Sequence, residues 1–67
     1  PKHAIAYYLI GKIRAFQKQL PQAAQFISDA IKLDMTISEL FEDEKEDFLE
    51  RKVNIKKLTN LILDKAN

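Results

Sequence analysis

The chain has 67 residues, no cysteine, a single glycine and a formal net charge of +1, so it has room for one domain and excludes disulfides and thiolate metal sites. No stretch approaches the roughly 20 consecutive apolar residues of a membrane-spanning helix. Lys12 and Arg14 also interrupt the apolar N-terminal stretch where a signal peptide would continue. We expect one all-α domain over residues 1–67 in a cytoplasmic (intracellular, reducing) compartment.

The charged residues fall into three blocks. Residues 1–33 contain five basic residues and one acid, residues 34–50 contain eight acids and one lysine, and residues 51–67 contain five basic residues and one acid. A strong nucleic-acid binder needs a dense basic face. This layout does not supply one, so nucleic acid is not the partner we expect.

Residues 3–18 are expected to form the first helix. One face is marked by apolar residues at alternating spacings of three and four, namely Ala6, Leu9, Ile13, Phe16 and Leu20. Tyr7, Ile10 and Gly11 form a second apolar strip, so the helix needs cover on more than one side. Tyr7 is expected in the core, and Tyr8, which lies off the main strip, is the better surface candidate. Gly11 costs about 1 kcal/mol relative to Ala in a helix interior, and close approach of another backbone is a physical reason to accept that cost.

A second helix is expected to begin at Pro21, which suits a first helical turn, and to lie antiparallel to the first after a short connection. Its end is ambiguous. Thr36 and Glu39 match a capping box, which indicates a stop near Asp34. Against this, an unbroken 4-3-4-3 spacing of apolar residues crosses the same point, through Phe26, Ala30, Leu33, Ile37 and Leu40. We favour one helix over residues 21–41, kinked near 34–36, with a stop at Asp34 as the alternative.

Residues 43–65 are expected to form the last helix, with Asn54 as a point where it can bend. The acids of residues 42–47 complement the positive end of that helix, and a basic partner surface is the alternative interpretation of the same acids. The architecture expected is an antiparallel helical hairpin plus a third helix. This is either a three-helix bundle or a single repeat with a capping helix.

No group of residues has the spacing that catalysis or metal binding requires. His3 is the only histidine and lies near the terminus, and Ser28 and Ser38 have no neighbouring base to activate them. One glycine is too few for a phosphate-binding loop, and no cluster supplies a metal cage. We therefore expect no enzyme activity, no catalytic residue, no metal and no cofactor.

Residues 4–34, AIAYYLIGKIRAFQKQLPQAAQFISDAIKLD, resemble one tetratricopeptide repeat. The positions that carry the resemblance are Tyr7, Ile10, Gly11, Ala23, Ile27, Ala30 and Leu33-Asp34. The chain departs from the repeat at Arg14, where an aromatic is usual, at Lys18, where glycine turns the chain, and at Met35, where proline is usual. Residues 35–67 form no second repeat.

In that family the inner face of the first helix binds extended peptides. Carried over by position, the resemblance assigns partner binding to five residues, namely Ile5, Tyr8, Lys12, Ala15 and Phe16. A lone repeat cannot bury its own faces. The last helix would therefore act as a cap, or the chain would belong to a homo-oligomer or to a longer array.

Two other families share parts of the pattern. A microtubule-interacting and trafficking (MIT) domain is a three-helix bundle whose second helix runs on, as residues 30–41 can, and it binds a partner helix between its helices. IGKIRAF and LDMTISELFEDE look like the first helix and the closing segment of an Xre-type helix-turn-helix, but its glycine turn and recognition-helix spacing are missing or shifted. The function expected is a non-catalytic protein–protein interaction module, or adaptor, that binds a peptide or helix of a partner protein. The alternative is a small Xre-like helix-turn-helix DNA-binding regulator.

Overall fold

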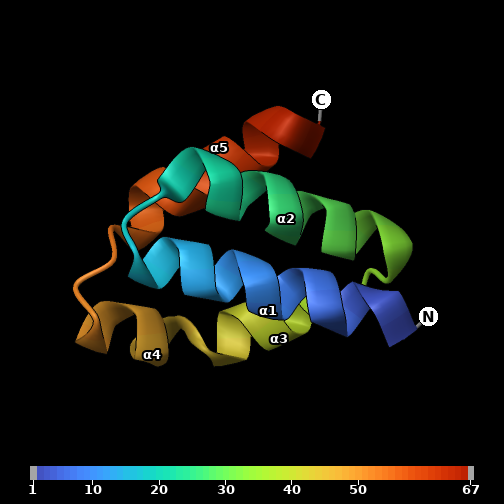
Figure 1. Cartoon of the computed structure of the whole chain (residues 1–67), viewed down its shortest axis with the longest axis horizontal. Coiled ribbons are helices and arrows are strands. Elements are labelled where there is room, and N and C mark those ends of the chain that lie inside the picture. Colours follow the sequence, from blue (N-terminus) through green and yellow to red (C-terminus); the bar gives the residue numbers. More distant parts are fainter. Residues whose placement is uncertain (1, 67) are drawn as a thin grey trace.

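The computed structural model describes the backbone of residues 2–66 and the side chains of residues 3–65. That part of the chain is all-α and has no strand (Figure 1). Its helices are α1 (Lys2–Phe16), α2 (Leu20–Leu33), α3 (Ile37–Asp43), α4 (Lys45–Glu50) and α5 (Ile55–Ala66). The all-α fold class is therefore confirmed, but shorter helices replace the second and third of the three that the sequence predicted.

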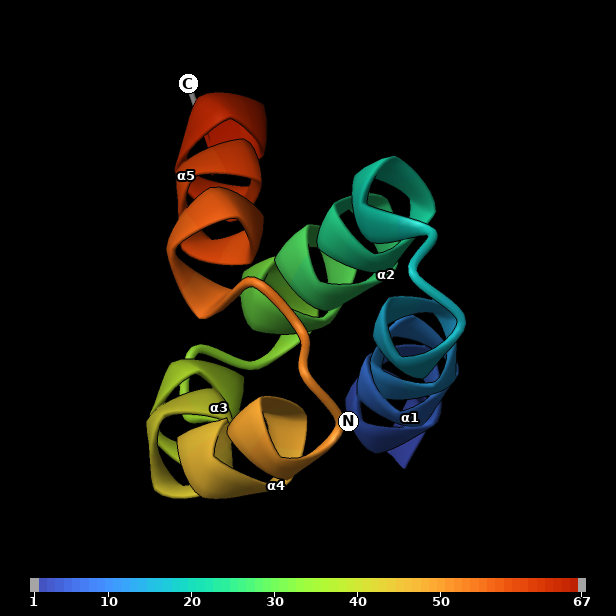
Figure 2. The ribbon, with the colours of Figure 1, turned by 90° about the vertical axis from the view of Figure 1, so that its left-hand side faces the viewer.

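The first two helices form an antiparallel hairpin, as expected, and α2 lies between α1 and α5 (Figure 2). Gly11 is buried where the two helices of the hairpin meet. A Cβ atom at this position would lie 2.7 Å from Cγ1 of Ile27 and 3.1 Å from the carbonyl oxygen of Ala23. The expectation that Gly11 permits close approach of another backbone is confirmed.

The buried face of α1 is not the face that the apolar spacing predicted. Tyr8 is fully buried and Tyr7 is 39% exposed, so the expected assignment of Tyr7 to the core and Tyr8 to the surface is wrong. Leu9 and Ile13, which were expected on the main buried strip, are each about half exposed. Because α1 is apolar on almost every side, its sequence did not define which arc would face the core.

The second helix ends at Leu33, so the favoured expectation of one helix over residues 21–41 is wrong and the stop at Asp34 is correct. Asp34 is extended, with φ −153° and ψ 107°. Its carboxylate accepts hydrogen bonds from the backbone N–H of Thr36 (3.0 Å) and from the Thr36 hydroxyl (2.6 Å). Thr36 itself makes no side-chain cap. The helix therefore ends because the Asp34 side chain forms a turn with Thr36, and not because of the expected capping box.

The expected helix over residues 43–65 is also wrong, because α4 ends at Glu50 and α5 begins at Ile55. Lys52 has a left-handed backbone (φ 60°), and the N–H of Val53 donates to the carbonyl of Phe48 (2.9 Å). This is the Schellman pattern of a helix end, at which glycine is the usual left-handed residue. Asn54 then caps α5, since its side-chain oxygen accepts a hydrogen bond from the N–H of Lys57 (3.0 Å).

Helices α3 and α4 form a layer beside α1 and lie below α5 in Figure 2. Phe48 is fully buried, and its ring centroid lies 5.6 Å from that of Phe16 and 5.4 Å from that of Phe41. The core thus continues from the α1–α2 hairpin into α3 and α4, while Leu58 and Ile62 join α5 to it. Within residues 2–66 no helix is both long enough and apolar enough to cross a bilayer.

Candidate protein-binding groove

The five residues assigned to partner binding by the resemblance lie on α1, but they do not form one open surface. Tyr8 and Ala15 are fully buried, and Lys12 and Phe16 are partly covered. Ile5 is 53% exposed, on the far side of α1 with Leu9 and Ile13. Residues of the α3–α4 segment contact three of the five, namely Tyr8, Lys12 and Phe16, and so occupy the place where a peptide would contact them.

A cluster of polar side chains holds the α3–α4 layer to α1. The Tyr8 hydroxyl donates to Oε1 of Glu44 (2.6 Å). The Lys12 ammonium donates to the same oxygen (3.0 Å) and to Oδ2 of Asp47 (3.2 Å). The Lys12 nitrogen also lies 5.8 Å from the ring centroid of Phe16. Tyr8 and Glu44 are 36 residues apart in the chain, and Lys12 and Asp47 are 35 residues apart, so only the tertiary fold brings them together.

The same cluster shifts two pKa values. Burial raises the pKa of the Tyr8 phenol, and the hydrogen bond to Glu44 and the nearby carboxylates raise it further. For Lys12, burial acts to lower the pKa, but the hydrogen bonds to Glu44 and Asp47 and their negative charges outweigh it, so the pKa is raised. Both groups therefore keep their protons more firmly in the folded state. We call this cluster a clamp, because its hydrogen bonds join α1 to the α3–α4 layer and each donor already has an acceptor.

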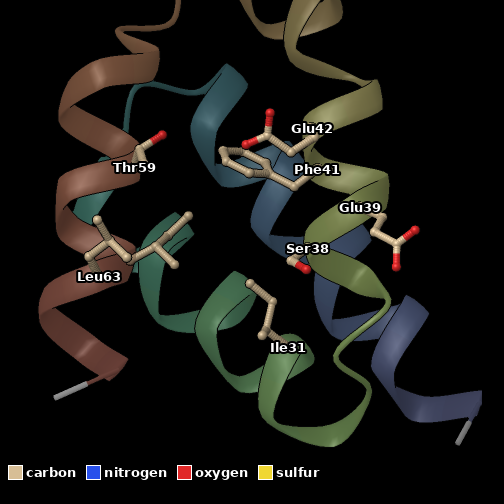
Figure 3. A pocket seen from close by; sticks show the side chains of 8 residues that line it. Ile31, Ser38, Glu39, Phe41, Glu42, Thr59 and Leu63 are labelled. Carbon is tan, nitrogen blue, oxygen red and sulfur yellow. The ribbon is translucent and has the colours of Figure 1, made fainter.

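An open apolar groove lies elsewhere, between α5 on one side and α2 and α3 on the other (Figure 3). We call it the α2–α3–α5 groove. It consists of two adjoining cavities of about 300 and 320 Å³, which share Ile31, Ser38, Ile62 and Leu63. The other lining residues include Met35, Phe41 and Thr59, with Glu39 and Glu42 on the α3 side and Lys32 at the α2 end.

The groove has apolar walls and an apolar floor. Ile31 of α2 lies at its base, Phe41 of α3 on one side and Leu63 of α5 on the other (Figure 3). Leu63 is 57% exposed and Met35 is 78% exposed, so large apolar side chains face solvent at its mouth. Contiguous exposed apolar surface of this kind marks interaction sites more often than isolated exposed residues do.

Few polar groups line the groove. The Ser38 hydroxyl is already engaged, donating to the carbonyl of Met35 (2.8 Å). The hydroxyl oxygen of Thr59, on the α5 wall, is buried and has no hydrogen-bond partner among the described residues. Leaving such a group unsatisfied costs about 1–3 kcal/mol.

Sequence reasoning did not assign these residues to a site. Ile31, Met35 and Leu63 are large apolar residues that the sequence patterns did not place in the core, and this was the available signal. Nothing local shows that they converge, because they belong to three separate segments. Among the described side chains, no three His, Asp or Glu residues are grouped so that they could hold a metal ion.

No protein-family model matches the chain, and no curated protein or solved structure matches it significantly. We therefore infer its function from the geometry of the α2–α3–α5 groove.

Proposed function

We propose that the protein is a non-catalytic protein–protein interaction module that binds a helix of a partner protein in the α2–α3–α5 groove. The observation that carries this proposal is the exposure of Met35 and Leu63 at the mouth of a groove with an Ile31 and Phe41 interior. Burying such side chains against a partner contributes about 25 cal/mol per Å² of apolar area. The groove therefore offers binding energy without chemistry.

A helix suits this groove better than an extended peptide. An extended peptide leaves its backbone N–H and C=O groups in need of partners. The groove supplies few, since Ser38 is engaged and the wall residues Ile62 and Leu63 are apolar. A helix satisfies its own backbone and presents apolar side chains every three or four residues, which is the helix-in-groove mode of recognition.

The α1–α2 hairpin supports the tetratricopeptide-like interpretation in part. Gly11 packs closely against α2, and Lys18 adopts the left-handed conformation (φ 65°) at the position where that repeat has glycine. Three residues of the inner face that binds peptides in that family, namely Tyr8, Lys12 and Phe16, are covered here by the α3–α4 segment. The proposed groove lies between helices, as the partner site of the MIT family does, although α2 ends at Leu33 instead of running on.

A small DNA-binding regulator is the second candidate, and one observation favours it. Basic residues gather at the end of the molecule where the α1–α2 turn, the α4–α5 connection and the start of α5 meet (Figure 1). They are Lys18, Arg51, Lys52, Lys56 and Lys57, and the Lys18 ammonium donates to the carbonyl of Arg51. DNA binding through this end would weaken steeply as salt rises. Retention on duplex DNA at low and high salt separates the two candidates.

Two leucines provide a matched test of the groove. Leu63 lines the groove and is 57% exposed, whereas Leu49 on α4 does not line it and is 59% exposed. Peptides selected from a displayed library of amphipathic helices on the wild-type protein should lose binding to Leu63→Asp and keep binding to Leu49→Asp. If both variants bind the selected peptides as the wild type does, the groove is not the site.

A further inference from the structure

We propose that the partner helix carries lysine or arginine along the edge that faces α3, where these side chains pair with Glu42 and Glu39. This inference rests on the proposed function of the α2–α3–α5 groove and adds the chemistry of the occupant. It starts from an excess of acids beside the groove. Residues 34–50 contain eight acids and one lysine, and only part of that charge is neutralised within the domain.

The ion pairs show which acids are used internally. Lys12 is shared by Glu44 and Asp47, and Lys45 pairs with Glu42 (3.1 Å). Among the described side chains, no cation lies within ion-pair distance of the other five acids of this stretch, namely Asp34, Glu39, Asp43, Glu46 and Glu50. The Glu42–Lys45 pair is itself an exposed contact between neighbouring residues, with Glu42 64% exposed, so it is weak and can be exchanged.

Two acids line the groove, the unpaired Glu39 and the weakly paired Glu42, and both belong to its α3 side. Glu39 and Glu42 lie one turn apart on α3, and the Glu42 carboxylate lies beside the ring of Phe41 at the mouth, while Glu39 is on the outer side of α3 (Figure 3). The facing α5 wall is neutral, being lined by Thr59, Ile62 and Leu63. A bound helix therefore meets negative charge along one edge. A lysine or arginine there reaches Glu42 directly and Glu39 through its long flexible stem.

The expected effect is modest in size and depends on salt. Exposed ion pairs of this kind change affinity by about two- to fivefold each, so reversing both Glu39 and Glu42 should weaken a basic-edged helix by about tenfold or more. Since the Debye length falls from about 10 Å at 0.1 M to about 3 Å at 1 M ionic strength, the difference should shrink in high salt. The binding energy from burial of the partner's apolar stripe should not shrink in high salt.

A displayed library of amphipathic helices tests this directly. Every member has an apolar stripe, and the positions flanking the stripe vary among lysine, glutamate and glutamine. Selection is performed on the wild-type protein, and the binding of selected helices is then compared between Glu39→Lys/Glu42→Lys and Asp43→Lys/Glu50→Lys. The second pair changes the net charge equally but lies outside the groove. Circular dichroism confirms folding, and Glu39→Gln/Glu42→Gln replaces the first pair if it does not fold.

Lysine should be enriched along one flank of the selected helices. Binding should then fall about tenfold for the Glu39/Glu42 reversal and much less for the control. Helices that lose binding with Leu63→Asp yet show no flank preference overturn the basic-edged partner and leave the groove function intact. Selection of no helix, or of helices that bind Leu63→Asp as well as the wild type, overturns both.

Discussion

Replacing Gly11 with alanine should have two opposing effects on the stability of the fold. Alanine is favoured over glycine in a helix interior by about 1 kcal/mol, so on propensity alone Gly11→Ala should stabilise α1. The structure predicts the opposite. The added Cβ would lie 2.7 Å from Cγ1 of Ile27, 3.1 Å from the carbonyl oxygen of Ala23 and 3.1 Å from Cβ of Phe26.

None of these neighbours can move aside easily. Ile27 is fully buried, and its Cγ1 atom is bonded directly to the branch point, not at the free end of a flexible chain. The Ala23 oxygen belongs to the backbone of α2. Overpacking of this kind costs about 1–3 kcal/mol, and the rigid surroundings place it near the upper limit. Subtracting the gain in propensity leaves a net destabilisation of about 2 kcal/mol.

Urea unfolding followed by circular dichroism measures this change, with thermal unfolding as a second readout. A loss of about 2 kcal/mol should lower the melting temperature of so small a domain by about 8–16 °C. Ala6→Gly, at an exposed position of the same helix, calibrates the propensity effect and should cost about 1 kcal/mol. In an Ile27→Ala background the shortest of these contacts is removed, so Gly11→Ala should cost clearly less than it does in the wild type. A Gly11→Ala protein that is more stable than the wild type would refute the close packing inferred for α1 and α2.

Four further outcomes follow from the structure. Tyr8→Phe removes the hydrogen bond to the Glu44 carboxylate and should lower the free energy of unfolding by about 1.5 kcal/mol in urea; an unchanged midpoint would show that the clamp adds nothing. Because the pKa values of Tyr8 and Lys12 are raised in the folded state, both groups stabilise the fold fully at pH values below their ordinary pKa values of 10.0 and 10.5. This stabilisation is lost as the pH rises above those values. Stability should therefore fall as the pH rises past 10.0, and less steeply in Tyr8→Phe/Lys12→Met; equal slopes would contradict the assignment. Lys52→Gly relieves a left-handed lysine and should stabilise by about 0.5–1 kcal/mol, which thermal unfolding would detect. Thr59→Val removes a buried hydroxyl that lacks a partner and should raise the free energy of unfolding by about 1 kcal/mol; a loss of stability would indicate that this oxygen is satisfied.

Several features of the fold were predictable because their causes are local. Pro21 indicated where α2 begins, within one residue of its start at Leu20. Gly11 indicated a close contact between helices before the partner helix was known. The absence of strands among residues 2–66 agrees with a composition that has one glycine and many aliphatic residues.

The two wrong helix boundaries have a common cause. At both positions the helix ends without the glycine or proline that usually marks a helix end. Lys52 occupies the left-handed position where glycine is expected, and the Asp34 carboxylate makes the turn that the capping-box pattern assigned to Thr36. Val53 and Phe48, which close the turn around Lys52 through a backbone hydrogen bond, are both buried in the core, so tertiary packing supports this left-handed residue.

The sequence by itself determined that this chain is helical, that its first two helices pair, and that Gly11 lies where they touch, because these properties depend on neighbouring residues. Only the tertiary structure decided which arc of α1 is buried, since α1 is apolar on nearly every side and its partners lie more than thirty residues away in α3 and α4. It also decided where the candidate site lies. The α2–α3–α5 groove exists only once Ile31, Phe41 and Leu63 converge from three helices, and no local pattern records that convergence.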